Sequence, residues 1–161
     1  MTPGAGNGRA YRDVLGRYPT GVTIVTCQGP DGPSAITANS FASVSLDPPL
    51  VLWCPAKASR RYDLFCAAQD YAIHILAEDQ AALSRQYARA GHGFPPELWE
   101  TDTNGLPRLT RFAARLTCRR VALHEAGDHA IVVGEVLMAE TQPVKPLVFA
   151  QGGYGHYAPH G

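Results

Sequence analysis

Short stretches in which apolar and polar residues alternate recur along the chain, and this alternation is the pattern of half-buried β-strands. Residues 22–27 form one such stretch, and they are rich in β-branched side chains, which favours a strand. The run Gly29-Pro30-Asp31-Gly32-Pro33 follows and predicts a turn, because Gly and Pro reverse the chain. Together the two features predict a hairpin that leads into the segment beginning at Pro33.

The segment from residue 33 to residue 53 places hydroxyl-rich residues directly before an apolar run. Ser and Thr side chains hydrogen-bond to nearby backbone and disfavour regular helix, so we expect strands and turns here. Asp47-Pro48-Pro49 ends the polar part, and the apolar residues 50–53 are typical of a strand buried on both faces. Polar donors at the rim of such a sheet suit a ligand with a flat apolar body and a polar edge. From composition alone, an ordinary Ser/Thr-rich turn is the simpler interpretation.

Three segments predict helices, namely residues 10–18, 62–65 and 78–90. The first is amphipathic and ends at Pro19, which cannot continue a helix. Ser59 precedes the second helix and is a candidate N-cap. In the third, Leu83 and Tyr87 are four residues apart and therefore share one face, which we expect to be buried.

Further strands are predicted over residues 71–76, 116–123, 130–139 and 147–149. In the first of these, alternation puts His74 on the face opposite Ile73 and Ile75 of a half-buried strand, where a single His is usually structural. Residues 91–109 contain several Gly and Pro residues without a period, so we expect a long functional loop, a lid or the wall of a site. About six short strands with three helices predict a mainly β (α+β) fold, an antiparallel barrel with peripheral helices rather than a doubly wound sheet.

The chain has 161 residues, which is enough for one domain with its own core. We expect a flexible N-terminus over residues 1–9 and a single domain over residues 10–161. The 14 basic and 14 acidic residues balance and no Lys/Arg run exceeds two residues, so no nucleic-acid or anionic-membrane partner is expected. Residues 1–10 lack an apolar signal-peptide core and no later stretch approaches a membrane span, so we expect a soluble cytoplasmic protein.

Spacing excludes several common sites. The four cysteines form no C-x-x-C pair and match no zinc site, and three of them lie in apolar runs typical of buried thiols. His124 and His129 are five residues apart rather than four, so His124-Glu125 is not part of a helical H-E-x-x-H zinc site and predicts a hairpin tip instead. The glycines around Tyr154 precede no helix, which excludes a Rossmann site. We expect no metal.

Residues 37–52, T-A-N-S-F-A-S-V-S-L-D-P-P-L-V-L, resemble the central motif of the flavin reductase family, whose members partner two-component flavin monooxygenases. Other pieces occur in the matching order: residues 18–23, residues 54–60, Gly127-Asp128-His129 and the Gly-rich turn at Tyr154. The resemblance covers residues 10–157. It implies an FMN-binding split β-barrel and a homodimer with the flavin near the subunit interface.

The resemblance also implies a flavin site along residues 37–40, which would bind the polar edge of the ring system. The flavin phosphate is expected at the start of the second helix, where backbone N–H groups and basic side chains attract anions. Relatives usually have an Arg near the end of the third helix that also holds this phosphate, and here Gln86 stands beside Arg85. The implied flavin-binding residues are Pro33, Ser34, Ala35, Ile36, Thr37, Ala38, Asn39, Ser40, Ser43, Cys54, Pro55, Ala56, Lys57, Ser59, Arg60 and Gln86.

The same resemblance makes His129 the leading catalytic residue. We expect it to orient the nicotinamide rather than to relay a proton, because hydride transfer needs no protein base. Relatives often have a positive residue after the last strand, where this chain has Gln151, and often have Asn where it has His74. The implied nicotinamide-binding residues are Asp128, His129, Phe149, Ala150, Gln151, Gly152 and Tyr154.

The implied activity is reduction of FMN or FAD by NADH or NADPH, with release of the reduced flavin to a partner monooxygenase. Two alternatives stay open. The departures at Gln86 and Gln151 allow a non-catalytic flavin carrier on the same fold, and the long segment 91–109 allows a flavoprotein that keeps its flavin and oxidises a small substrate itself. The sequence leaves open the choice of flavin, the choice of nicotinamide, the partner and the pathway.

Overall fold

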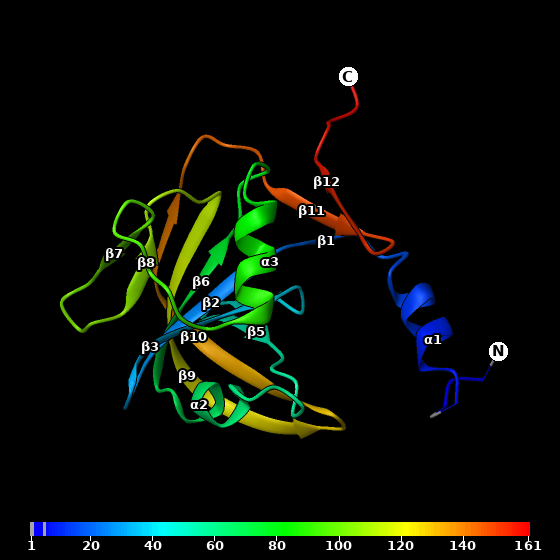
Figure 1. The fold of residues 1–161 in the computed structure, drawn as a ribbon, viewed down its shortest axis with the longest axis horizontal. Coiled ribbons are helices and arrows are strands. Elements are labelled where there is room, and N and C mark those ends of the chain that lie inside the picture. The colour runs from blue at the N-terminus through cyan, green and yellow to red at the C-terminus, as the bar shows by residue number, and fades with distance from the viewer. Residues whose placement is uncertain (1, 5) are drawn as a thin grey trace.

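A seven-stranded antiparallel sheet forms the body of the molecule in the computed structural model, which describes residues 2–4 and 6–161. The strand order is β3-β2-β6-β9-β10-β5-β4, and the sheet curls so that β3 and β4 are its two free edges (Figure 1). Because the edges do not pair with each other, the barrel is split rather than closed. The predicted antiparallel fold with peripheral helices is confirmed. The strands are β2 (Thr23–Gly29), β3 (Gly32–Ala38), β4 (Ala42–Leu46), β5 (Pro49–Trp53), β6 (Asp70–Ile75), β9 (Ala114–Ala126) and β10 (His129–Thr141).

Two smaller sheets complete the strands of the described residues. One consists of β1 (Thr20–Gly21), β11 (Leu147–Ala150) and β12 (Gly153–His156), and the other is a hairpin of β7 (Trp99–Thr101) and β8 (Pro107–Leu109). The hairpin corrects the expectation of an irregular loop over residues 91–109. Trp99 and Leu109 are buried in the core, so their packing holds this segment against the sheet.

The hairpin tip between β9 and β10 lies where residues 124–129 predict it. Ala126 pairs with His129, and Gly127 between them has a φ of 66°, a left-handed conformation that glycine adopts without steric cost. Both strands are longer than the predicted ones because the pairing continues to the tip. Segments 124–125 and 129 are therefore strand ends, which confirms that His124 and His129 do not share a helix.

Three helices flank the sheet: α1 (Gly8–Leu15), α2 (Tyr62–Ala67) and α3 (Ala81–Arg89). Helix α3 buries Leu83 and Tyr87 as predicted. The prediction that Ser59 caps α2 is wrong: the N-cap is Arg61, whose backbone N–H donates to Ser59 Oγ at 3.2 Å, so Ser59 shapes the turn before the helix. Helix α1 has no buried residue and stands apart from the sheet (Figure 1). The expectation of a flexible N-terminus falls in part on residues 1 and 5, which lie outside the described residues.

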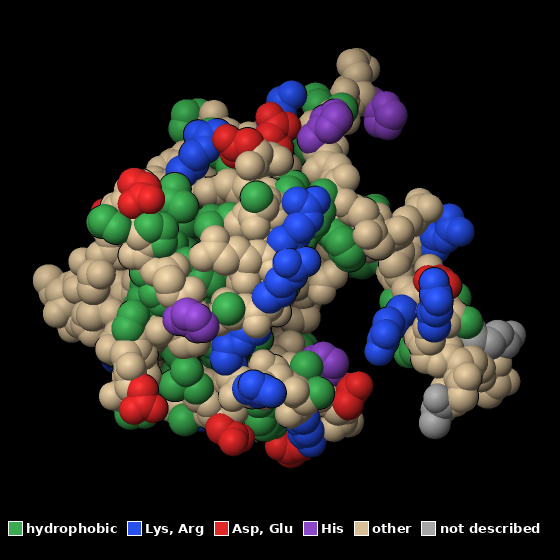
Figure 2. Space-filling model, viewed as in Figure 1, with side chains coloured by type: hydrophobic (Ala, Val, Ile, Leu, Met, Phe, Trp, Pro, Cys, Tyr) green, Lys and Arg blue, Asp and Glu red, His purple; other side chains and the backbone are tan. Residues whose placement is uncertain are grey.

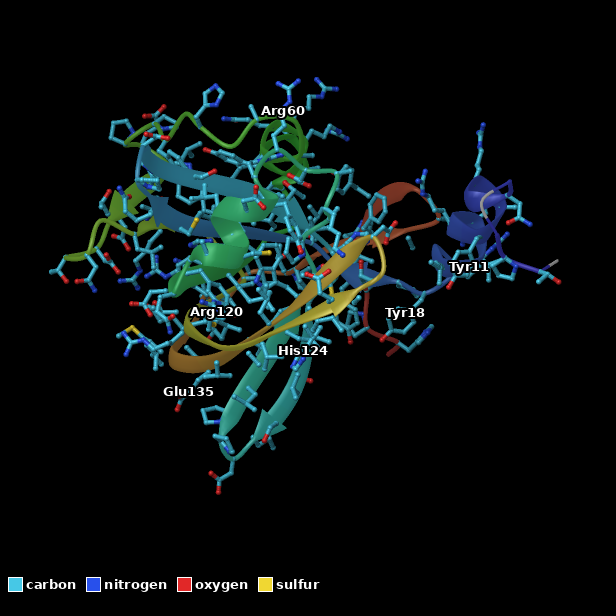
Figure 3. The ribbon with its side chains drawn as sticks, turned by 90° about the horizontal axis from the view of Figure 1, so that it is seen from below. Tyr11, Tyr18, Arg60, Arg120, His124 and Glu135 are labelled. Carbon is cyan, nitrogen blue, oxygen red and sulfur yellow. The ribbon has the colours of Figure 1, made fainter. Side chains whose placement is uncertain are left out.

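Two hydrophobic clusters pack on the sheet, one around Trp53 and Tyr71 and the other around Tyr87 and Trp99. The prediction that residues 50–53 are buried on both faces is wrong. Val51 and Trp53 are buried, whereas the alternate residues are half-buried, because none of the described elements covers the outer face of the β4–β5 hairpin, which projects from the body in Figure 3.

His74 is fully buried rather than half-buried, because the β7–β8 hairpin covers its face of β6. Its ring packs edge-on against Trp99 at a centroid distance of 5.6 Å, and Nδ1 donates to Ile24 O at 2.9 Å. Burial lowers the pKa of His74 to about 3, so the ring is neutral near pH 7.

The cysteines are free thiols, and Cys27 and Cys118 are fully buried. Burial raises the pKa of both to about 12, so neither is a reactive thiol. Cys54 and Cys66 are half-buried rather than buried. Within the described part of the chain, no helix has the length and apolar composition needed to cross a bilayer.

Candidate functional site

The end of β3 forms a wall of two cavities. The first, which we call the basic cavity, has a volume of about 340 Å³ and is lined by Ile36, Thr37, Ser59, Arg60, Arg61 and Arg89, among others. The second, the α1 cavity, is larger, at about 1160 Å³, and separates helix α1 from the sheet. Figure 2 shows the second as a hollow beside the α1 segment. Thr37 lines the first cavity, and Asn39 and Ser40 line the second, so the two cavities are neighbours along the chain.

Arg61 stabilises the wall of the basic cavity through hydrogen bonds to three backbone carbonyl groups. Its Nη1 donates to the carbonyl oxygens of Ala35 at 2.7 Å and Tyr87 at 2.8 Å, and its Nη2 donates to that of Ala88 at 3.2 Å. One guanidinium therefore joins the start of α2 to β3 and to the last turn of α3. Three of its five N–H donors are used in these contacts, so it supports the cavity wall.

Arg60 and Arg89 are the exposed cations of this cavity. In Figure 3, Arg60 lies next to α3, whose last turn carries Arg89. The hydroxyl of Ser59 accepts a hydrogen bond from Arg61 N and is free to donate its own proton into the cavity. Two cations and a hydroxyl donor, open to solvent at one rim, suit a phosphate group.

Sequence reasoning missed Arg89. The structure places Gln86 beside Gly93 rather than in the basic cavity, and Arg85 lies over the Tyr154 ring at 4.8 Å. Arg89 is three residues beyond Gln86 and therefore on the same side of the helix, one turn closer to the cavity. That spacing was the signal that could have found it.

Several hydroxyl groups of the predicted flavin segment already have structural partners. Thr37 Oγ1 donates to Ser84 O at 2.6 Å, which fixes α3 on β3. Ser40 Oγ accepts from Cys54 N at 2.9 Å and donates to Cys54 O at 3.2 Å, which joins the ends of β3 and β5. What this segment offers a ligand is therefore mainly its backbone.

The outer edge of β3 supplies that backbone. Ala35 N donates to Gly91 O at 2.9 Å, away from the partner strand β2. Because backbone groups alternate along an antiparallel strand, the N–H and C=O of Thr37 also point away from β2, toward the cavities. A free strand edge is well suited to hydrogen-bond the polar edge of a planar ring system.

The α1 cavity brings together four segments that are separated in sequence, around residues 12–20, 39–40, 129 and 149–152. Its lining includes six of the predicted site residues: Asn39, Ser40, His129, Phe149, Gln151 and Gly152. The segment after β5 lies beside them, because Lys57 N donates to Asp128 O at 2.9 Å and Ala130 N donates to Pro55 O at 3.1 Å. Ala56 also forms an isolated bridge with His129.

His129 is paired with its neighbour in the chain. Its Nδ1 lies 2.7 Å from Asp128 Oδ1, and since a carboxylate can only accept, Nδ1–H donates. This contact lowers the pKa of the Asp128 carboxyl, since His129 stabilises its ionised form. The bond fixes the ring orientation and leaves Nε2 free to bind a ligand.

Other predicted residues lie outside both cavities. Pro33 and Ser34 are at the far end of β3, and Ser43 is exposed on β4. Lys57 is ion-paired with Glu125, and this pairing lowers the pKa of the Glu125 carboxyl. Tyr154 packs on Phe149 and its hydroxyl lies 2.9 Å from Ser84 Oγ, so it supports the wall of the α1 cavity. Among the described residues, no three His, Cys, Asp or Glu side chains are grouped as metal ligands would be.

The two cavities together fit a phosphorylated ring cofactor that lies along the end of β3. The cations are placed to hold a phosphate, the strand edge offers hydrogen-bonding groups to the polar edge of a ring, and the His–Asp pair lines the neighbouring cavity, where a second ligand would fit. A split antiparallel barrel with a two-part site of this kind suits a flavin-dependent oxidoreductase. The model of the flavin reductase like domain matches residues 15–158, so the chain belongs to the flavin reductase family, as the sequence motifs predicted.

Curated relatives and solved structures agree with this family. The chain is 49% identical over 158 residues to FMN reductase (NADH) SmoA of Agrobacterium fabrum, covering 98% of this chain and 91% of SmoA. It is 36% identical over 153 residues to HsaB, a reductase subunit of a flavin-dependent monooxygenase of Mycobacterium tuberculosis, covering 91% of this chain and 80% of HsaB. It spans 64% and 50% of two further relatives from Rhizobium meliloti.

Among solved structures, the NADH:FAD oxidoreductase SgcE6 of Streptomyces globisporus C-1027 superposes with a TM-score of 0.89 at 34% identity, covering 100% of this chain and 99% of that chain. SgcE6 has also been solved in complex with NAD and FAD fragments. The predicted family, fold and enzyme class are thus confirmed.

Proposed function

We propose that this chain reduces FMN or FAD with NADH and releases the reduced flavin to a partner flavin-dependent monooxygenase. The observation that carries the proposal is the position of the β3 end between a cavity lined by cations and a cavity lined by His129. The names of SmoA, SgcE6 and HsaB support NADH as the reductant and a monooxygenase as the recipient. We infer that the protein works in the cytoplasm, where NADH is supplied.

The residues of the chain bind and orient the two ligands. Arg60, Arg89 and Ser59 hold the flavin phosphate, and the free edge of β3 binds the polar edge of the ring. When both are bound, the nicotinamide supplies a hydride and the flavin accepts it, a transfer that needs no protein base. His129, oriented by Asp128, binds the nicotinamide through Nε2, and this orientation brings the two rings close enough to react.

A test of the activity is a stopped-flow record of flavin absorbance after NADH is mixed with protein and FMN. Rapid bleaching is expected for the reductase. Tight flavin binding without bleaching would establish the carrier alternative instead. Turnover of a small organic substrate by retained flavin, with no added monooxygenase, would establish the third alternative.

His129 is tested by replacement with Ala. We expect the rate of NADH oxidation to fall about tenfold with little change in FMN affinity, since the side chain binds nicotinamide rather than flavin. His124→Ala is the matched control, because His124 is exposed on the same hairpin and lines neither cavity. An unchanged rate and Michaelis constant in His129→Ala would contradict the role.

We also propose that the chain forms a homodimer through the outer face of the β4–β5 and β9–β10 strands. These neighbouring strands expose large apolar side chains, namely Val44, Leu46, Val121, Leu123, Leu137 and Met138. Leu46 is 95% exposed, and contiguous apolar patches on a protein surface mark association sites. The β4–β5 hairpin projects from the body (Figure 3) and offers this face to a second copy.

Sedimentation equilibrium tests the dimer. Leu46→Glu should shift the mass toward the monomer, because a buried unpaired charge opposes association. Leu98→Glu is the control, since Leu98 is exposed directly before β7 and lies on none of these four strands. A wild-type mass of one chain would exclude the dimer.

A further inference from the structure

Two arginines of the N-terminal segment line the α1 cavity. Arg12 lies in the last turn of α1, and Arg17 lies in the linker that leads to β1. Asp13 is the carboxylate of the same lining, so cations outnumber anions on this wall. Figure 2 shows basic side chains on the α1 segment beside the hollow. The hydride transfer proposed above uses neither arginine.

The side chain of Gln151 holds Arg17 at the rim of the cavity. Arg17 Nη1 donates to Gln151 Oε1 at 3.3 Å, and Gln151 N donates to Gly16 O at 2.7 Å. These two bonds tie the linker after α1 to the turn between β11 and β12. The guanidinium keeps its remaining N–H donors for a ligand.

The backbone of Gln151 has a conformation that residues with a side chain rarely adopt. Its φ is 51°, and it is the one residue other than glycine with positive φ among the described residues. With Gly152 at 79°, it occupies a two-residue hairpin turn, where Asn or Gly would fit better at the first position. The hairpin turn itself requires this conformation, and the side chain that it carries ends at Arg17.

We propose that Arg17, positioned by Gln151, and Arg12 bind the diphosphate of the nicotinamide dinucleotide, so that the N-terminal segment forms the outer wall of the reductant site. The inference rests on the proposed function and deepens it. Guanidinium groups match phosphate oxygens in charge and geometry. A cavity of about 1160 Å³ is also far larger than a nicotinamide ring needs, so it has room for the rest of the dinucleotide.

FAD also carries a diphosphate, and the two sources must be distinguished. The basic cavity, with Arg60 and Arg89, already supplies a phosphate site at the other end of the β3 segment. A flavin that lies along this segment has its phosphate there, at the end away from the α1 cavity. His129 and Phe149 share the α1 cavity with the two arginines, so the ligand on that side is the nicotinamide dinucleotide.

The test compares two reductants with FMN as the flavin. NADH has the diphosphate, whereas reduced nicotinamide mononucleotide lacks it but delivers the same hydride. For Arg17→Met we expect the KM for NADH to rise about tenfold, the effect of losing one charge-assisted hydrogen bond, with no change for the mononucleotide. Arg12→Met should act in the same direction. The matched control is Arg9→Met, because Arg9 is exposed on α1 but does not line the cavity.

Three results would overturn the inference. One is an unchanged KM for NADH, and another is an equal rise for both reductants, which would indicate a structural effect of the N-terminal segment. The third is a weaker FAD affinity with an unchanged KM for NADH, which would assign the diphosphate to the flavin.

Failure of the proposed function itself is distinguishable. If the wild-type protein does not oxidise NADH, calorimetric titration with ADP-ribose still tests the arginines. Weaker binding by Arg17→Met than by the wild type supports the inference, and equal binding, or no binding by either, overturns it.

Discussion

The basic cavity and the α1 cavity share the end of β3 but are built differently. Three elements enclose the basic cavity, and Arg61 and Thr37 hydrogen-bond these elements to one another. The outer wall of the α1 cavity is a helix without a buried residue, tied to the sheet through Gln151. The proposed phosphate site is therefore already formed before a ligand binds, whereas the proposed reductant site has an outer wall with few contacts with the core.

The largest effect is expected from removing the Arg61 guanidinium, which hydrogen-bonds the walls of the basic cavity to one another. Arg61→Met leaves three carbonyl oxygens without their donor, so we expect the free energy of unfolding to fall by about 3 kcal/mol, measured by urea denaturation. Arg60→Met is the control, and its exposed side chain should change stability by less than about 0.5 kcal/mol. Equal losses of stability in the two variants would contradict the conclusion that Arg61 supports the fold whereas Arg60 is a ligand-binding cation.

The free energy of unfolding should fall at acidic pH because of His74, which lies in the core beneath the basic cavity. His74 packs on Trp99, which packs on Tyr87, whose carbonyl accepts from Arg61. Burial lowers the pKa of His74 in the folded protein to about 3, from the ordinary histidine value of 6.5. Between these values the unfolded chain binds the extra proton, so stability falls as pH falls. The loss amounts to about 2 kcal/mol at about pH 5.

His74→Asn should lack this component. Plots of the free energy of unfolding against pH should therefore be steeper for the wild type than for the variant across this range. Parallel curves would contradict the assignment.

The cations of the basic cavity should matter for FMN and not for riboflavin, which lacks the phosphate. Arg60→Met and Arg89→Met should each weaken FMN binding about tenfold and leave riboflavin binding unchanged. Arg85→Met serves as the control on the same helix, because Arg85 lies over Tyr154 instead. Fluorescence quenching of each flavin measures these affinities. A similar loss for both flavins would place the phosphate elsewhere.

The smallest effect is expected at the strained turn of the α1 cavity. Gln151→Gly removes an L side chain from a left-handed conformation, so the free energy of unfolding should rise by about 0.5 kcal/mol. The same change should raise the KM for NADH, because Arg17 loses its positioning partner. A gain in stability with unchanged kinetics would show that Gln151 has no part in the site.

Alternation and turn residues predicted most of the fold because these signals are local. Residues 22–27 and 130–139 are strands in the structure, and residues 78–90 contain α3. The β7–β8 strands were missed because each has three residues, too few for a period, and they are held by the burial of Trp99 and Leu109. The burial of residues 50–53 was misjudged for a related reason, since what covers a strand depends on distant parts of the chain.

The site was predictable where a family motif marked it and not where a distant element supplied the residue. The motifs named Asn39, His129 and Gln151, which the structure gathers in one cavity. None of the motifs that mark the site includes Arg12 or Arg17. Only the fold places these arginines in the same cavity as His129. Hydroxyl-rich composition overstated the number of ligand donors, because Thr37 and Ser40 use their hydroxyl groups to join structural elements.

The attachment of α1 through one turn has an evolutionary consequence. Substitutions in this helix leave the packed interior untouched, since none of its residues is buried. Lineages that differ in electron donor are therefore expected to diverge first in this appendage and in residue 151, while the residues around Arg61 change slowly. Exchanging the appendage between such lineages is then a direct route to altering donor preference without redesigning the barrel.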